Sequence, residues 1–235
     1  MPSNKKLLQA AAGSAGGDKL YVEDVFSTFL YTGTGQARAI DNGIALSDEG
    51  GLVWLKSRSN ADSHYLFDTV NGPEKTLSSD NTAAGSDYSD YWDFPSAGTE
   101  GFKLLDAPAN YSGWTLASWT FRKAEKFFDV VTYTGNGSDP RNIAHNLGSV
   151  PKMILVKRTD TGDDWMVYHV STTAQAYLVL NSTAASANGI RPFTNTEPTD
   201  AVFTVNNYAT VNTNGGTYVA YLFASDAGGY GDDGS

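Results

Sequence analysis

The alternation of hydrophobic and polar positions along this chain predicts β-strands over most of its length. The most regular example is residues 115–121, where Ala117, Trp119 and Phe121 occupy every second position. A period of two is that of a strand, because successive side chains point to opposite faces of a sheet. Residues 52–56 are apolar at nearly every position, which is typical of a strand buried on both faces or at the centre of a sandwich. Further strands are expected at residues 26–31, 65–67 and 101–105.

The second half of the chain repeats this pattern. The segment Tyr31-Thr-Gly-Thr-Gly35 recurs as Tyr133-Thr-Gly-Asn-Gly137, and the apolar strand at 52–56 recurs at 153–157. The offset is 101 or 102 residues, because 133 minus 31 is 102 and 153 minus 52 is 101. Such a regular offset indicates a tandem duplication with single-residue slips, and therefore two domains of about 100 residues, a common domain size.

The connections between the expected strands are short and rich in Gly, Asn and Asp. These residues tolerate the backbone angles of tight turns, and no long helix interrupts the strands. We therefore predict an all-β fold of two tandem β-sandwich (jelly-roll-like) repeats, preceded by a short helical or extended N-terminal arm. Because only residues 122–126 separate the repeats, we expect the pair to behave as one semi-rigid rod. The predicted divisions are an arm at 1–24, repeats at 25–123 and 124–226, and a Gly/Asp-rich tail or linker at 227–235.

Charge and composition exclude several classes of function. The net charge is −10 and no basic run exceeds Lys5-Lys6, so the chain is a poor candidate for binding nucleic acid or an anionic membrane surface. No apolar run approaches the roughly 20 residues of a membrane helix, so we expect no membrane insertion. The sequence contains no cysteine, which excludes disulfides and thiolate metal sites and leaves packing and strand pairing to stabilise the domains.

The first 24 residues differ in kind from the strands that follow. Leu7, Leu8, Ala11 and Ala12 recur at helical spacing, and Gly13 is suited to end a helix. A helix of about nine residues is marginal in water by itself. One interpretation is a frayed chain end. The interpretation that we favour is an anchoring arm, whose apolar stripe docks on a larger assembly.

The residues that an enzyme would need form no recognised pattern. His64, His145 and His169 are the three histidines of the chain, and none lies in a nucleophile elbow or a metal-binding helix motif. A catalytic triad needs partners that the sequence around them does not supply. We therefore expect no catalytic residues and no cofactor, and hence a protein that is not an enzyme.

An acidic turn is the best candidate for a metal site. Asp160, Asp163 and Asp164 offer the carboxylate oxygens that calcium prefers. Their spacing matches no recognised calcium loop, and we favour the explanation that these carboxylates hydrogen-bond within their own turn. We expect no metal, and keep these three residues as weak candidates.

Residues 86–94 concentrate aromatic side chains among small polar ones. Tyr88, Tyr91 and Trp92 belong to the type of surface with which proteins bind carbohydrate or other proteins at a low entropy cost. The second repeat has no good counterpart and carries Ile190-Arg-Pro-Phe193 instead. The competing interpretation is that Trp92 and Phe94 cover the edge of the sandwich.

Seven segments, spread over both repeats, carry a resemblance to a known family. They lie at residues 51–58, 64–69, 77–84, 118–122, 127–137, 145–151 and 218–223. They resemble repeat-containing virion proteins of tailed bacteriophages, often tail-fibre or related appendage proteins, whose sandwich units look like the concanavalin A and laminin-G lectin-like class. The resemblance covers residues 19–235. It implies a location in the virion, contacts with other virion proteins, a homo-oligomer that we expect to be a trimer, and contact with a host-surface glycan or protein.

These observations combine into one expectation with two alternatives. We expect a structural virion protein of a tailed phage, in a tail fibre or similar appendage, attached by its N-terminal arm and contributing to host-surface binding. The first alternative is a capsid decoration protein. The second is a carbohydrate-binding, lectin-like module.

Overall fold

A computed structural model of the chain describes residues 20–94, 99–105, 108–188 and 192–225. In these residues the secondary structure is almost entirely antiparallel β-sheet, so the predicted all-β fold class is confirmed. The helical elements of the described residues are short: α2 (Val22–Val25), η1 (Pro73–Lys75), η2 (Pro108–Asn110) and α3 (Ala209–Asn212).

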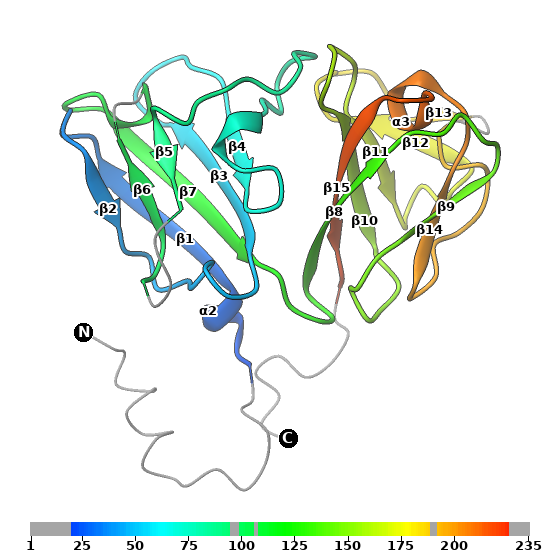
Figure 1. Cartoon of the computed structure of the whole chain (residues 1–235), viewed down its shortest axis with the longest axis horizontal. Coiled ribbons are helices and arrows are strands. Elements are labelled where there is room, and N and C mark those ends of the chain that lie inside the picture. The colour runs from blue at the N-terminus through cyan, green and yellow to red at the C-terminus, as the bar shows by residue number, and fades with distance from the viewer. Residues whose placement is uncertain (1–19, 95–98, 106–107, 189–191, 226–235) are drawn as a thin grey trace, which may run out of the picture.

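The first unit, which we define as the described residues up to 123, contains two sheets (Figure 1). The larger sheet has the strand order β1-β7-β3-β4, and the smaller has the order β2-β6-β5. The strands are β1 (Phe26–Thr32), β2 (Arg38–Ile40), β3 (Gly51–Ser57), β4 (Tyr65–Asp68), β5 (Trp92–Asp93), β6 (Phe102–Leu104) and β7 (Thr115–Arg122).

The second unit, which we define as the described residues from 124 on, also contains two sheets. The larger has the order β13-β12-β11-β10-β15-β8, and the smaller pairs β14 with β9. The strands are β8 (Phe128–Thr134), β9 (Arg141–Ala144), β10 (Met153–Arg158), β11 (Met166–His169), β12 (Ala176–Val179), β13 (Ala187–Asn188), β14 (Val202–Val205) and β15 (Thr217–Phe223).

The larger sheets of the two units share strand order and pairing register. β1-β7-β3-β4 in the first corresponds to β8-β15-β10-β11 in the second. Phe26 lies opposite Phe121 just as Phe128 lies opposite Phe223. Lys56 lies opposite Ala117, and the position 101 residues later, Lys157, lies opposite Val219. Because a one-residue slip would turn every side chain to the other face, the shared register gives the two sheets the same inward and outward positions.

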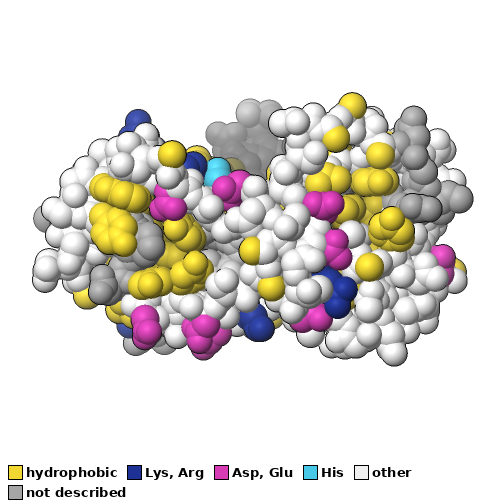
Figure 2. Space-filling view, turned by 90° about the horizontal axis from the view of Figure 1, so that it is seen from above, with side chains coloured by type: hydrophobic (Ala, Val, Ile, Leu, Met, Phe, Trp, Pro, Cys, Tyr) yellow, Lys and Arg dark blue, Asp and Glu magenta, His cyan; other side chains and the backbone are white. Residues whose placement is uncertain are grey.

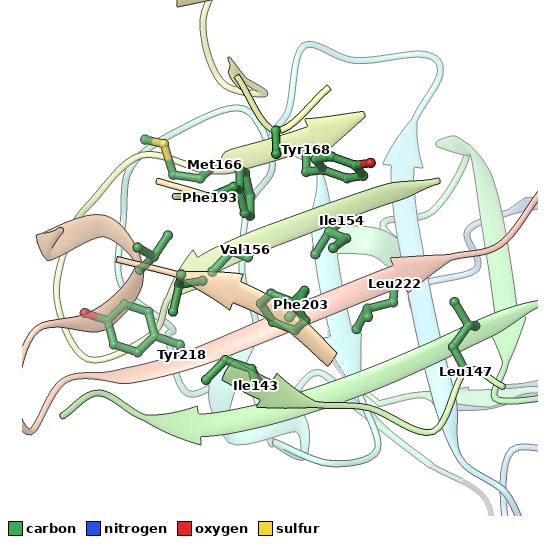
Figure 3. Close-up of a cluster of buried hydrophobic side chains, with 14 residues drawn as sticks. Ile143, Leu147, Ile154, Val156, Met166, Tyr168, Phe193, Phe203, Tyr218 and Leu222 are labelled. Carbon is green, nitrogen blue, oxygen red and sulfur yellow. The ribbon is translucent and has the colours of Figure 1, made fainter. Parts of the chain in front are cut away.

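Each unit encloses its own hydrophobic core between its two sheets. In the first unit Val53, Phe67 and Phe102 are fully buried in this core. In the second unit Ile154 and Phe203 face each other across the corresponding space (Figure 3). The two sheets therefore pack as a β-sandwich in each unit, with apolar side chains on the inner faces.

A third core lies between the two units, and we call it the inter-unit core. It joins the outer faces of the two larger sheets, so that part of each sheet is covered on both sides. The buried members are Leu52, Leu66 and Leu77 of the first unit, and Phe128, Val130, Leu155, Trp165, Val167, Val219 and Tyr221 of the second. The near-continuous apolar pattern of β3 and β10 follows from this arrangement, because a strand with two buried faces has no polar side.

Polar contacts cross the same boundary. The Tyr221 hydroxyl donates to the Asp68 carboxylate at 2.8 Å, and the indole nitrogen of Trp165 donates to the Ser78 carbonyl at 2.8 Å. The carbonyl of Thr82 accepts from the Lys157 ammonium at 3.2 Å and from the backbone of Asp163 at 2.8 Å. These groups lose water at the boundary and gain a partner there, which removes the penalty of burying them unpaired.

Candidate functional site

The aromatic segment of the first unit is only partly at the surface. Trp92 is fully buried, and its ring stacks on Phe67 with centroids 5.2 Å apart. Its indole nitrogen donates to the Thr76 hydroxyl at 2.8 Å, so the ring has no unpaired polar atom. The prediction that Trp92 takes part in surface recognition is therefore wrong. Strand β5 is the reason, because it pairs with β6 and turns this side chain into the sandwich.

Tyr88 and Tyr91 lie over Trp92 and are half-buried, and we call this pair the tyrosine patch. Their ring centroids are 5.1 Å apart, and the Tyr88 ring lies 5.3 Å from that of Trp92. The backbone holds them in place, because the Tyr91 amide donates to the Tyr88 carbonyl at 2.8 Å. The patch therefore presents rigid aromatic faces, which is the property that lowers the entropy cost of binding.

Acidic residues neighbour the tyrosine patch in the sequence. Asp87 accepts from the backbone and hydroxyl of Ser89, and these bonds hold the pKa of its carboxyl below the usual value. Asp93 forms an ion pair of 3.6 Å with Lys103. Carboxylates accept hydrogen bonds from hydroxyl groups, and aromatic rings pack on apolar faces, so this segment carries both kinds of group with which proteins hold a neutral sugar.

The second unit carries no matching pair of tyrosines in its described residues. Phe193 is buried there and packs edge-on against Tyr168, with centroids 5.9 Å apart. The Tyr168 hydroxyl donates to Glu197 at 2.6 Å. The aromatic side chains of this region serve the core of the second unit, whereas the first unit leaves two rings partly exposed.

The weak metal candidates do not converge. Asp160 accepts two bonds from the Arg158 guanidinium, at 2.9 and 3.1 Å, which hold its carboxyl pKa below the usual value. Asp164 accepts from the side chain of Asn181 at 2.8 Å, and Asp163 accepts from the backbone of Asp164. Within the described parts of the chain, no three histidine or acidic side chains lie close enough to hold a metal ion.

Each of the three histidines forms a hydrogen bond with another residue of the fold. His64 accepts from the Trp54 indole at 2.7 Å, and burial lowers its pKa against the opposing effect of Asp80. His145 contacts the Thr199 carbonyl at 3.2 Å, and burial lowers its pKa also. The ring of His169 accepts from the Ser171 backbone at 3.2 Å. One ring nitrogen of each histidine is therefore engaged in a hydrogen bond within the fold.

The repeated Gly turns are anchored on a pair of buried asparagines. Asn110 accepts from the backbone of Thr34, and its counterpart Asn212 accepts from the backbone of Asn136. A side chain at Gly33 or Gly135 would collide with a carbonyl oxygen of the chain segment opposite. The Thr-Gly-x-Gly motif is therefore structural, because only glycine permits this approach of two backbones.

The anchoring residues predicted in the N-terminal arm, Leu7, Leu8, Ala11 and Ala12, lie outside the described residues, as does the tail from residue 226. The last part of the predicted arm is described. Tyr21 and Asp24 exchange hydrogen bonds at the start of α2, and Val25 is fully buried. Residues from Tyr21 on therefore belong to the folded first unit.

Comparison with known protein families gives one match. The sequence matches the family described as a domain of unknown function, DUF7483, over residues 22–235. The chain belongs to the DUF7483 family. No curated protein and no solved structure matches it. The DUF7483 match spans both units, which agrees with the inter-unit core that joins them.

Sequence reasoning missed the residues that join the two halves of this DUF7483 domain. Asp68 and Lys157 are both buried, and both bond across the boundary. Burial lowers the pKa of Lys157 to about 8, and burial followed by the nearby Asp68 raises the pKa of Tyr221. A charged residue inside an otherwise apolar strand was the available signal.

In the described residues, no helix is both long and apolar enough to cross a membrane.

Proposed function

We propose that the chain is a non-enzymatic structural module of a tailed-phage virion, in a tail fibre or a similar appendage. The resemblance of seven segments to repeat-containing virion proteins supports the phage assignment. The inter-unit core is the main support for the structural role. Domains of one chain usually move relative to each other unless the interface between them is large and hydrophobic. This core meets that condition, so the two units act as one stiff spacer.

In this proposal the segment before α2 attaches the module to other virion proteins. Leu7, Leu8, Ala11 and Ala12 supply an apolar stripe for docking. Assembly of several copies, of which we propose three, places several host-facing surfaces on one appendage. Repetition of a weak site raises avidity without any new contact.

The structural hydrogen bonds of the histidines support the non-enzymatic part of the proposal. A general base must be free to take a proton from a substrate. His64 and His145 instead use a ring nitrogen to hold Trp54 and the Thr199 carbonyl.

A second function, recognition of carbohydrate on the host surface, is favoured by the tyrosine patch. Tyr88 and Tyr91 offer flat faces on a buried aromatic support, and Asp87 and Asp93 are close to them in the sequence. Binding of sugars to the patch is compatible with the structural role, because Tyr88 and Tyr91 pack on the core of the first unit and are not members of the inter-unit core.

The location of the chain in the particle tests the virion proposal. Cryo-electron microscopy of particles carrying a tagged chain should place it in a tail appendage. Density on the capsid lattice at high copy number would instead favour a decoration protein, and absence from the particle would overturn the proposal.

A truncation tests the attachment. Deletion of residues 1–19 keeps α2 and should leave the melting temperature unchanged while incorporation into particles is lost. The double substitution Leu7→Ser with Leu8→Ser should act in the same way. Normal incorporation of both variants would show that the sandwiches themselves make the attachment.

Host adsorption tests the tyrosine patch. Tyr88→Ala with Tyr91→Ala should reduce adsorption of assembled particles by at least about tenfold, since two aromatic contacts are lost. Tyr208→Ala, at a tyrosine of the second unit that is 39% exposed, is the control. Equal adsorption of all three particles would rule the patch out as a receptor site.

A further inference from the structure

The outer face of the larger sheet in the second unit changes character along its strands. On β8, Phe128 and Val130 are buried in the inter-unit core, whereas Thr132 and Thr134 are exposed. These four side chains share one face, because residues two apart in a strand point the same way. The first unit covers the apolar end of this face, next to the connector, and leaves the hydroxyl-bearing end open.

The neighbouring strands show the same change. On β15, Tyr221 and Val219 are buried in the inter-unit core, and the next position on that face is the exposed Thr217. Thr217 lies opposite Thr134 in the ladder, and its hydroxyl is 2.7 Å from that of Thr159. Several hydroxyl groups from three chain segments therefore meet where the apolar contact ends.

The first unit supplies the opposite wall. Asn71 and Lys75 line a cleft of about 450 Å³ together with Thr132, Thr134, Thr159 and Thr217. We call it the inter-unit cleft. Figure 2 shows acidic and basic side chains and one histidine near the boundary between the units, with further acidic and basic side chains elsewhere on both units. The volume lies within the range of about 300–1,000 Å³ that is usual for sites of small ligands.

The groups in the cleft define what it can bind. Each threonine hydroxyl both donates and accepts, which suits a ligand that carries many hydroxyl groups. The Lys75 ammonium has no ion pair or hydrogen bond with any described residue, although the chain carries a net charge of −10. The amide of Asn71 is fixed by its bond to Asp68 at 2.9 Å, so this wall is held in place by the same carboxylate that binds Tyr221.

We propose that the inter-unit cleft binds an acidic saccharide. The hydroxyls of Thr132, Thr134 and Thr217 exchange hydrogen bonds with the sugar hydroxyls, and Lys75 pairs with the sugar carboxylate. Both units contribute to the site, so it exists only while the inter-unit core is formed. The site is separate from the tyrosine patch, and its existence does not depend on where the chain sits in a particle.

Two probes with the same hydroxyl pattern test the proposal on the purified chain. Digalacturonate carries carboxylates, and its methyl ester carries none. Titration followed by NMR should show digalacturonate binding about fivefold more tightly than the ester, because an exposed ion pair contributes modestly. This preference should shrink as salt is added, since salt screens exposed charges. Equal binding of the two probes would overturn the acidic assignment, and binding of neither at millimolar concentration would overturn the site.

Substitutions assign the binding to the cleft. Lys75→Gln should abolish the preference for digalacturonate and leave binding of the ester unchanged. Thr134→Val with Thr217→Val should weaken both probes by about tenfold, since each lost hydrogen bond contributes a factor of a few. Restoring the hydroxyls with Thr134→Ser and Thr217→Ser should recover binding, which separates a lost contact from a lost fold.

Control substitutions lie outside the cleft. Lys103→Gln removes a lysine from β6, and Tyr88→Ala alters the tyrosine patch. Both should leave the two affinities unchanged. Loss of digalacturonate binding in either control, or retention of full binding in the double threonine variant, would show that the saccharide binds elsewhere. Neither result bears on the location of the chain in particles, so failure here and failure of the virion proposal are distinguishable.

Discussion

The two units share their strand order and ladder register, yet they use the outer face of the larger sheet differently. In the second unit Leu155 and Trp165 are buried on this face. The positions 101 residues earlier are Trp54 and His64, which are only half-buried and bond to each other. The units therefore pack with an offset, so that the second unit is covered more completely than the first.

The comparison separates residues that maintain the sandwich from residues that distinguish one unit. Tyr31 and Tyr133 both donate to a carbonyl of the opposite segment, and Arg38 and Arg141 both lie over these tyrosine rings. Such features occur in both units and stabilise the fold. The tyrosine patch and Lys75 occur once, in the first unit, and each belongs to one of the two candidate binding sites.

The largest effect is expected from a charge placed in the inter-unit core. Leu155→Asp should lower the free energy of unfolding by about 4 kcal/mol or more, because a carboxylate would be buried with no partner. Trp54→Asp, at the matching position, should cost clearly less, since that side chain is half-buried. Denaturant unfolding measures both. Equal losses would contradict the offset packing.

A similar loss in both units is expected at the Gly turns. Gly33→Ala and Gly135→Ala should each lower the free energy of unfolding by about 3 kcal/mol, because the new methyl group collides with a backbone carbonyl. Thr34→Ala, at an exposed position of the same turn, should cost about 0.5 kcal/mol or less. If only one glycine proves sensitive, the turn does not have the same role in the two units.

A smaller effect is expected from the hydrogen bond that crosses the boundary. Tyr221→Phe removes one donor from the Asp68 carboxylate, which keeps its bonds to Val70 and Asn71. The loss should be about 1.5 kcal/mol, as is typical of a hydrogen bond to a charged group. Unchanged thermal stability of this variant would show that the bond contributes nothing to the joint between the units.

A further effect concerns pH. Because burial lowers the pKa of Lys157 from the usual 10.5 to about 8, the folded chain binds fewer protons than the unfolded chain between these values. The contribution of Lys157 to the free energy of unfolding should therefore increase as the pH rises from about 8 to about 10.5. The free energy of unfolding of the natural chain minus that of Lys157→Met should therefore increase over this range. Parallel pH curves would contradict the lowered pKa.

The sequence by itself determined the strands and their repetition. Period-two alternation and apolar runs depend on neighbouring residues, so they are visible without a structure. Residues 52–56 and 153–157 were expected as buried strands, and β3 and β10 lie there. The expected strands at 65–67 and 101–105 correspond to β4 and β6.

The tertiary structure decided which face of each element is covered. Trp92 and the tyrosine patch are neighbours in sequence, but β5 turns the tryptophan inward and leaves the tyrosines half-buried. The inter-unit core and the inter-unit cleft bring together residues that are tens of residues apart. Such contacts depend on how two completed sandwiches fit against each other. No local pattern encodes that fit, because burial of apolar surface is non-directional and several arrangements satisfy the same alternation.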